Sequence, residues 1–310
     1  MSIAMNESLM TEVKDRPAYS PGLEGVIAGE SALCLVDEGE AGLLYRGYPI
    51  RELAEHSTFE EVAYLLLFGH LPNQKELTAF SGELIENAVL PRLFEVFLGR
   101  VPSSSHPMDI VRTGVSLLGM VDADAADHSH DANVRKSVRL LAQIPLIIAT
   151  SYRLMNGRLR VRPREDLSFA ENLLYLLTDR KGDDQAKAMA RVLGVSLTLY
   201  AEHEFNASTF AARVTASTMT DLHSAVTSAI GTLKGPLHGG ANEAVAEMFL
   251  EIGSRERAEI WVRETLAKKR RIMGFGHRVL KKGDARSEII QQHAESLSRI
   301  CGDQRWYEIA

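Results

Sequence analysis

The sequence predicts a mainly α-helical fold with one short β segment towards its N-terminal end. From residue 58 onward, helix-capping residues precede runs in which apolar side chains recur at helical spacing. Between residues 25 and 48, β-branched and apolar residues are instead broken by glycines, which is typical of short strands. The 310 residues are 45% apolar and 25% charged, so the chain can bury a core. We therefore expect a multi-helical protein with a minor sheet.

Two capping boxes mark the first predicted helices. Thr58 is followed three residues later by Glu61, and Asn73 by Glu76, the spacing at which each side chain satisfies a backbone N–H group of the other residue. Helical periodicity predicts further helices at residues 107–119, 134–155, 168–177, 185–200, 207–219, 222–233, 243–253, 258–269 and 287–301. Ahead of them, one or two short strands are expected from Val26, Ile27, Leu33, Leu35 and Val36.

Small residues dominate the helices predicted at 207–219 and 222–233. Alanine, serine and threonine on most sides of a helix let a second helix approach closely. This composition fits a close helix pair at the centre of a domain or across a dimer interface. It fits a simple core of small side chains equally well.

Composition and charge exclude several classes of protein. The net charge of −6 argues against a nucleic-acid partner, because phosphate binding needs an extended basic surface. No window approaches the ~18 consecutive apolar residues of a membrane span. Cys34 and Cys301 are too few and too far apart for a disulfide framework. We expect a soluble, cytoplasmic protein.

The strongest candidate for a functional site is His238, which lies in the glycine-rich stretch 234–243. Gly235, Gly239 and Gly240 can take positive φ angles and let a ligand come close to the backbone, and Pro236 fixes the chain ahead of the histidine. His203 and His277 stand in comparable settings, and Arg286 follows His277 nine residues later. Together these residues predict one site.

Several chemistries could use three histidines and an arginine. Catalytic zinc sites often have a closely spaced histidine pair, whereas His203, His238 and His277 lie on separate segments without a nearby cysteine. We therefore expect no metal, and we interpret His128 and His130 as parts of a solvated loop. Each histidine taken alone could be purely structural. As a set, they favour carbonyl activation, in which imidazoles donate to developing oxyanions and a guanidinium binds a carboxylate.

The sequence resembles the citrate synthase family from Gly22 to its last residue, and three motifs are the basis of this resemblance. They are Glu-His-Glu-Phe-Asn-Ala-Ser-Thr-Phe at 202–210, Gly-Pro-Leu-His-Gly-Gly-Ala-Asn-Glu at 235–243 and Ile-Met-Gly-Phe-Gly-His-Arg-Val at 272–279 with Arg286. The resemblance implies a large helical domain at 22–240 after a flexible lead-in at 1–21, a smaller domain at 241–310, and a homodimer. It also implies condensation of acetyl-CoA with oxaloacetate to citrate, with no cofactor beyond the coenzyme A thioester.

The resemblance assigns roles to particular residues. His238 would donate a hydrogen bond to the thioester oxygen as the enol forms, and His277 would polarise the ketone of oxaloacetate. Oxaloacetate would be bound by His203, His238, His277 and Arg286, with Ser208 and Asn206 supporting His238. The coenzyme A site would include Arg271, Met273, Gly274, Phe275 and Gly276. A solvated helix end is the alternative interpretation of the basic run at 268–271.

The sequence also departs from the family pattern. In citrate synthases the aspartate that takes the proton from the acetyl methyl group comes after the region where this sequence ends, and Asp303 does not stand in that motif. We expect the C-terminal part of the family pattern to be missing here. Two alternatives stay open: a 2-methylcitrate synthase that uses propionyl-CoA, and a non-catalytic relative that binds coenzyme A or dimerises.

Overall fold

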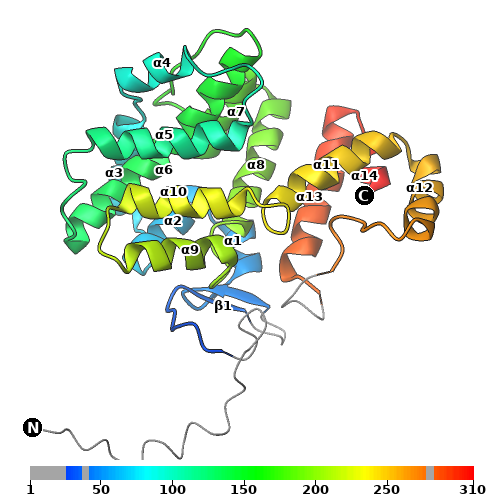
Figure 1. Ribbon diagram of the computed structural model, residues 1–310, viewed down its shortest axis with the longest axis horizontal. Helices are drawn as coiled ribbons and strands as arrows, with labels where there is room; N and C mark the ends of the chain where they lie inside the picture. Colours follow the sequence, from blue (N-terminus) through cyan, green and yellow to red (C-terminus); the bar gives the residue numbers. More distant parts are fainter. Residues whose placement is uncertain (1–25, 37–41, 277–282) are drawn as a thin grey trace, which may run out of the picture. The chain divides into compact units, whose positions relative to one another are not determined.

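The computed structural model describes residues 26–36, 42–276 and 283–310 (Figure 1). The chain divides into two compact units, Met1–Ser31 and Ala32–Ala310. The described part of the second unit forms fourteen α-helices and one three-stranded sheet. The predicted mainly α-helical class is confirmed. Among the described residues, no helix is both long enough and apolar enough to cross a membrane.

The sheet is antiparallel, in the order β1 (Cys34–Val36), β2 (Leu43–Tyr45), β3 (Tyr48–Pro49). Arg46 and Gly47 join β2 to β3 with φ angles of 50° and 89°. Two consecutive positive φ angles suit the right-handed twist of a tight hairpin. The prediction of one or two strands was therefore too low, and Val26 and Ile27 lie outside the strands, 51% and 89% exposed.

The helices follow the predicted order closely. Both capping boxes are present at Thr58 and Asn73, and the helix predicted at 222–233 has the predicted bounds. The helices are α1 (Ile50–His56), α2 (Phe59–Phe68), α3 (Gln74–Asn87), α4 (Arg92–Leu98), α5 (Pro107–Val121), α6 (His130–Met155), α7 (Phe169–Thr178), α8 (Asp184–Leu199), α9 (Ala207–Ala216), α10 (Leu222–Leu233), α11 (Gly240–Ile252), α12 (Arg255–Ala267), α13 (Ala285–Cys301) and α14 (Arg305–Ile309).

The differences lie at helix ends and in short helices. The short helices α1, α4 and α14 were not predicted, because five to seven residues give too few turns for a period to stand out. α6 begins four residues earlier than predicted, since the Ser129 side chain accepts a hydrogen bond from the N–H group of Ala132 and caps the helix. α9 ends at Ala216 instead of 219, where Met219 takes a φ of 62°.

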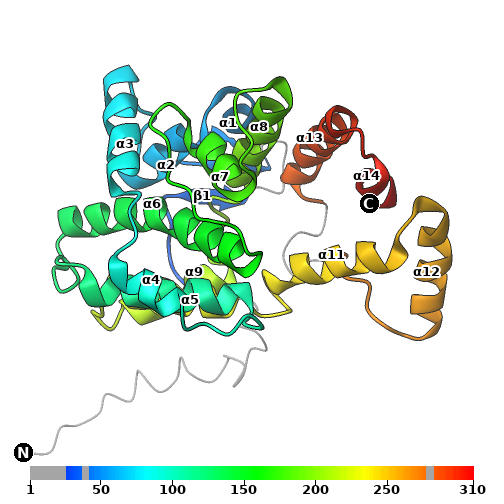
Figure 2. The same cartoon turned by 90° about the horizontal axis from the view of Figure 1, so that it is seen from above.

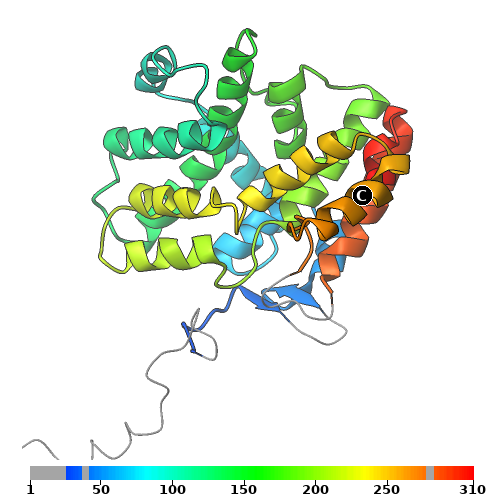
Figure 3. The ribbon, with the colours of Figure 1, turned by 45° about the vertical axis from the view of Figure 1, so that its right-hand side comes forward.

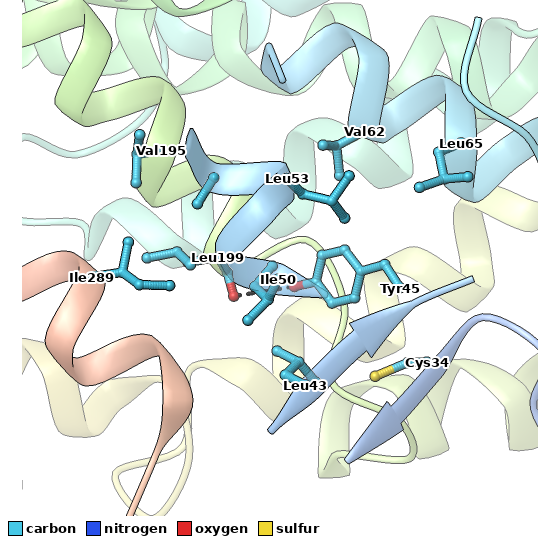
Figure 4. Close-up of a cluster of buried hydrophobic side chains, with 11 residues drawn as sticks. Cys34, Leu43, Tyr45, Ile50, Leu53, Val62, Leu65, Val195, Leu199 and Ile289 are labelled. Atoms are coloured by element: carbon cyan, nitrogen blue, oxygen red, sulfur yellow. Dashed lines mark hydrogen bonds between the residues drawn. The ribbon is translucent and has the colours of Figure 1, made fainter. Parts of the chain in front are cut away.

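One hydrophobic core joins the sheet to helices from both ends of the chain (Figure 4). Tyr45 is fully buried at its centre, packed with Ile50 of α1 and Leu199 of α8. Ile289 of α13 belongs to the same cluster, and α13 packs against α1 and α8. α14 packs against α13 and also against α11 and α12, and Figure 2 shows these four helices at the C-terminal end of the chain. The predicted division into domains at residue 240 stays a prediction.

The two helices rich in small residues, α9 and α10, lie side by side (Figure 3). α10 packs in turn on α5, and Ile230 of α10 joins a second core with Phe94, Val115 and Ile147. α9 has no buried residue: Val214 within it is 53% exposed, and Met219 shortly after its end is 65% exposed. The small residues of α9 therefore do not fill the centre of this chain, which disfavours the interpretation as a simple small-residue core.

A buried histidine lies where α5 ends and α10 begins. His223 is 1% exposed, and its Nε2 and Nδ1 atoms lie 3.4 Å from Asp122 Oδ2 and 3.8 Å from Asp221 Oδ1. Asp122 accepts two hydrogen bonds from Arg139, at 2.9 and 2.7 Å. Burial lowers the pKa of His223 below its ordinary value, although the two carboxylates oppose that shift. The folded protein therefore favours a neutral ring at this position.

We expect acid to destabilise the protein through His223. Since its pKa is lower in the folded than in the unfolded state, the unfolded chain binds more protons. The free energy of unfolding should then fall as the pH drops below about 6.5 towards the folded pKa, by at most about 1.4 kcal/mol per pH unit. Urea unfolding between pH 7 and 5 measures the free energy of unfolding at each pH. Its dependence on pH should be flatter in His223→Gln than in the wild type. The exposed His56 provides the control, because His56→Gln should keep the wild-type slope. Equal slopes in all three proteins would contradict the expectation.

Candidate active site

His238 lies in a tight turn between α10 and α11. The N–H groups of His238 and Gly240 both donate to the carbonyl of Gly235, at 2.9 and 3.1 Å. None of Gly235, Gly239 and Gly240 has a positive φ angle, so that part of the expectation was wrong, and the close approach of a ligand to their backbone stays a prediction. Gly239 and Gly240 are needed instead because the turn leaves no room for a side chain. A Cβ atom on Gly239 would lie 2.7 Å from the Leu233 carbonyl oxygen, and one on Gly240 would lie 2.5 Å from the Lys234 carbonyl oxygen.

Gly240→Ala should therefore disrupt this turn. The added methyl group meets backbone atoms, which move less easily than the end of a side chain, so we expect the free energy of unfolding to fall by about 2 kcal/mol. Denaturant unfolding measures the change. Gly82→Ala is the matched control, because its Cβ atom meets nothing within 4 Å and it lies within α3. A Gly240→Ala protein as stable as the control would show that the turn can adapt.

The His238 ring is held by the first turn of α9. The backbone N–H group of Ser208 lies 3.3 Å from Nε2, and the Ser208 hydroxyl lies 2.9 Å from the same atom. Asn206 caps α9 by accepting from Thr209 N–H, and its Oδ1 also lies 2.7 Å from Ser208 Oγ. Because a backbone N–H group can only donate, Nε2 is the acceptor, and the proton of the neutral ring lies on Nδ1. Burial lowers the pKa of His238 and favours that neutral ring.

His203 lies in the loop before α9, and this loop is anchored on the sheet. The Tyr45 hydroxyl lies within 2.9 to 3.2 Å of the carbonyl oxygens of Thr198, Leu199 and Glu202. Two residues after Glu202, the carboxylate of Glu204 accepts a hydrogen bond from the N–H group of Val36, at 2.8 Å. Strands β1 and β2 therefore fix both the loop that carries His203 and the start of α9.

Arg286 is paired with an aspartate that the sequence argument missed. Its Nε and Nη2 atoms donate to the Asp284 carboxylate at 2.8 and 2.6 Å, and both side chains are mostly buried. Burial alone would raise the pKa of the Asp284 carboxyl, but the hydrogen bonds and charge of Arg286 hold it below its ordinary value, and the charge of His203 acts in the same direction. His203, Asp284 and Arg286 therefore belong to one electrostatic neighbourhood.

The predicted coenzyme A segment is an exposed turn after α12. Arg271, Phe275 and Gly276 are exposed, and Phe275 is 77% accessible. Gly274 and Gly276 have φ angles of 87° and 83°, and a Cβ atom on Gly274 would lie 3.1 Å from the Val245 side chain of α11. This turn thus lies against the helix that begins just after His238. His277 lies outside the described residues.

The structure brings His238 together with Ser208 and Asn206. His203, in the loop just before Asn206, acts through its charge on Asp284, the partner of Arg286. Glu204, Asp284 and Glu243 had no predicted role, and in the structure they pair with Val36, Arg286 and His106. An Asp-x-Arg spacing at a predicted helix start was the available signal for Asp284. Within the described ranges, no group of three or more His, Cys, Asp and Glu side chains is arranged to bind a metal.

Comparisons with known proteins agree on one family. The sequence profile described as "Citrate synthase, C-terminal domain" matches residues 22–310. Citrate synthase 2 of Bacillus subtilis (strain 168) is 43% identical over 290 residues, which cover 93% of this chain and 77% of the relative. The 2-methylcitrate synthase of Shewanella oneidensis is 44% identical over 290 residues, covering 93% and 76%.

Solved structures of the family share the fold. The citrate synthase of Thermotoga maritima MSB8 superposes with a TM-score of 0.80 at 39% identity, covering 93% of this chain and 75% of that one. The citrate synthase of Thermoplasma acidophilum, solved as a ternary complex with carboxymethyl coenzyme A and oxaloacetate, gives a TM-score of 0.87 at 30% identity, covering 94% and 76%. Fold, site and comparisons lead to the same conclusion: this chain belongs to the citrate synthase family.

Proposed function

We propose that this protein condenses acetyl-CoA with oxaloacetate and releases citrate and coenzyme A. The observation that carries the proposal is the orientation of His238, whose Nε2 atom faces the Ser208 N–H group at 3.3 Å. The proton on Nδ1 is then available to an acceptor in the site. A neutral imidazole donor suits a thioester oxygen that gains negative charge when the neighbouring carbon loses its proton.

In the proposed reaction, a base removes a proton from the acetyl methyl group while His238 donates to the thioester oxygen. The resulting enol carbon attacks the ketone carbon of oxaloacetate, a carbon–carbon bond forms, and the ketone oxygen takes a proton. His277 is proposed to polarise that ketone. Water then cleaves the thioester of the citryl-CoA intermediate, which releases citrate and coenzyme A. No metal or further cofactor takes part in this scheme.

Oxaloacetate binding is proposed at His203 and Arg286, with His238 and His277 close to the reacting ketone. A guanidinium held by Asp284 presents a fixed fork to a carboxylate. Coenzyme A is proposed to contact the exposed turn at 271–276, where Arg271 and the preceding basic residues can meet its phosphates. We also propose that the protein works in the cytoplasm, with neither a nucleic acid nor a membrane as its partner.

Propionyl-CoA is the second candidate acyl donor, which would make the product 2-methylcitrate. Relatives of both names resemble this chain almost equally, at 43% and 44% identity. One methylene group gives only about 1–3 kcal/mol of discrimination in an apolar pocket. The ratio of the kcat/KM values for acetyl-CoA and propionyl-CoA therefore decides whether the protein is a citrate synthase or a 2-methylcitrate synthase.

The test combines turnover with binding. Release of free coenzyme A is measured with oxaloacetate and either thioester, and calorimetry measures the binding of oxaloacetate and of carboxymethyl coenzyme A separately. Release well above the rate without protein supports the proposed reaction. Binding of both ligands without release would identify a non-catalytic relative, and binding of neither would refute the proposal.

A homodimer is also proposed, formed through the exposed face of α9 and α10. The small residues of α9 and the exposed side chains of Val214 and Met219 leave a surface on which a second copy can pack closely. Val214→Glu should shift the molecular mass in solution from dimer towards monomer, because it places a charge in that contact. Light scattering after size-exclusion chromatography measures the mass. An unchanged mass would exclude this face.

A further inference from the structure

Both ends of the His238 turn are tied to the N-terminus of one helix, α5. Before the turn, Lys234 Nζ lies 2.7 Å from Asp109 Oδ2. After it, both carboxylate oxygens of Glu243 lie close to His106 Nε2, at 3.2 and 3.1 Å. His106 is the N-cap of α5, and Asp109 lies in its first turn. The ten residues from Lys234 to Glu243 therefore form a loop with both ends fixed to neighbouring points.

The position of the proton on His106 follows from its second contact. The backbone N–H group of Met108 donates to His106 Nδ1 at 3.1 Å. Since Nδ1 accepts this bond, the proton of the neutral ring lies on Nε2 and points at Glu243. The same Nε2–H group donates when the ring is protonated, with a stronger, charge-assisted bond. The link from α5 to α11 thus exists in both protonation states of His106.

α5 is a rigid support for this link. Val111 and Val115 of α5 lie in the core that also holds Phe94 and Ile230, and Asp109 is braced by Arg112 at 3.0 Å. The turn itself is tightly packed, because a Cβ atom on Gly239 would lie 2.7 Å from the Leu233 carbonyl oxygen and one on Gly240 2.5 Å from the Lys234 carbonyl oxygen. A movement of Glu243 away from His106 is therefore expected to shift His238 relative to Ser208.

We propose that His106 and Glu243 position His238 for its hydrogen-bonding role, with Lys234 and Asp109 fixing the other end of the turn. The proposal rests on the proposed function, since it concerns the placement of the group that would meet the thioester. His106 and Glu243 touch neither substrate in this scheme. They act by keeping Nε2 of His238 on the Ser208 N–H group, so that the proton stays on Nδ1.

Two substitutions of His106 distinguish its contact with Glu243 from its role as the N-cap of α5. In His106→Asn the side-chain oxygen can still cap α5 in place of Nδ1, but the side chain is too short to reach Glu243. In His106→Gln the amide nitrogen takes about the place of Nε2 and can still donate to Glu243. Glu243→Gln removes the charge that faces His106. Glu247→Gln makes the same change one helical turn later on α11, at a side chain that is exposed as that of Glu243 is.

The measurement is the ring ¹⁵N spectrum of His238 in the ligand-free protein, assigned by its loss in His238→Ala. The wild type should show one tautomer, with the proton on Nδ1. His106→Asn should convert it to a mixture, and Glu243→Gln should shift it in the same direction. His106→Gln and Glu247→Gln should keep the wild-type spectrum. A wild-type His238 spectrum in both His106→Asn and Glu243→Gln would overturn the proposal, as would a changed spectrum in Glu247→Gln.

Kinetics provide the second readout. His106→Asn should lower kcat for coenzyme A release about tenfold while the oxaloacetate dissociation constant stays within about twofold, because the displaced group acts mainly in the transition state. The failure of this inference is distinguishable from failure of the proposed function. If the wild type binds neither oxaloacetate nor carboxymethyl coenzyme A, the proposed function fails, while the spectra still decide whether the link positions His238.

Discussion

His238→Ala is expected to lower kcat for coenzyme A release about a thousandfold, because it removes the donor that meets charge appearing in the transition state. Ser208 N–H faces Nε2 at 3.3 Å, which places the proton of the neutral ring on Nδ1, and burial lowers the pKa and favours that neutral ring. Oxaloacetate should bind to the variant within about threefold of the wild-type affinity, because its proposed carboxylate contact is Arg286. Steady-state kinetics and calorimetry measure the two quantities.

The affinity for carboxymethyl coenzyme A tests the role of His238 without a catalytic reaction. Its carboxylate places an anionic oxygen close to where the thioester oxygen would gain charge, and affinity for it should fall about a hundredfold in His238→Ala. His56→Ala changes an exposed histidine at the end of α1 and should leave both ligands unaffected. A His238→Ala protein with near wild-type kcat, or with unchanged affinity for the analogue, would refute the role of His238.

The helices could be predicted from the sequence where local signals were strong. Thr58 and Asn73 accept backbone N–H groups at helix starts, as the two predicted capping boxes indicated. The short helices and the third strand could not be predicted in this way, because two to seven residues carry too little periodicity. The hairpin depends on Arg46, an unexpected residue at a positive φ angle.

The site could be predicted only in part, for a related reason. The glycine turn around His238 and the motif containing Ser208 are local patterns, and the structure joins them through two contacts of Ser208 with the Nε2 atom of His238. The partners that hold the site are distant in sequence: Glu204 bonds to Val36, and Glu243 to His106. Periodicity and capping describe residues a few positions apart, so pairings across more than a hundred residues need the fold itself.

Arg286→Lys is expected to weaken oxaloacetate binding about a hundredfold, a loss of about 2.7 kcal/mol, and to leave carboxymethyl coenzyme A binding to the free protein within about twofold. The Asp284 carboxylate takes the Nε and Nη2 side of the guanidinium, at 2.8 and 2.6 Å, so a ligand carboxylate would meet the Nη1 and Nη2 side. An ammonium group offers a single point of contact and cannot bind both carboxylates in this planar arrangement.

The matched control is Arg299→Lys at the other end of α13, where the side chain is 65% exposed and pairs with Glu295. It makes the same chemical change on the same helix, and it should leave both affinities at the wild-type level.

Asp284→Asn tests whether Asp284 holds the Arg286 guanidinium in place. It keeps the shape of the side chain but removes the charge that fixes the guanidinium, so oxaloacetate affinity should fall by less than in Arg286→Lys. Calorimetric titration measures each affinity. If Arg286→Lys bound oxaloacetate as tightly as Arg299→Lys, the carboxylate of oxaloacetate would have to be bound elsewhere, and Arg286 would serve only to brace Asp284 at the N-terminal end of α13.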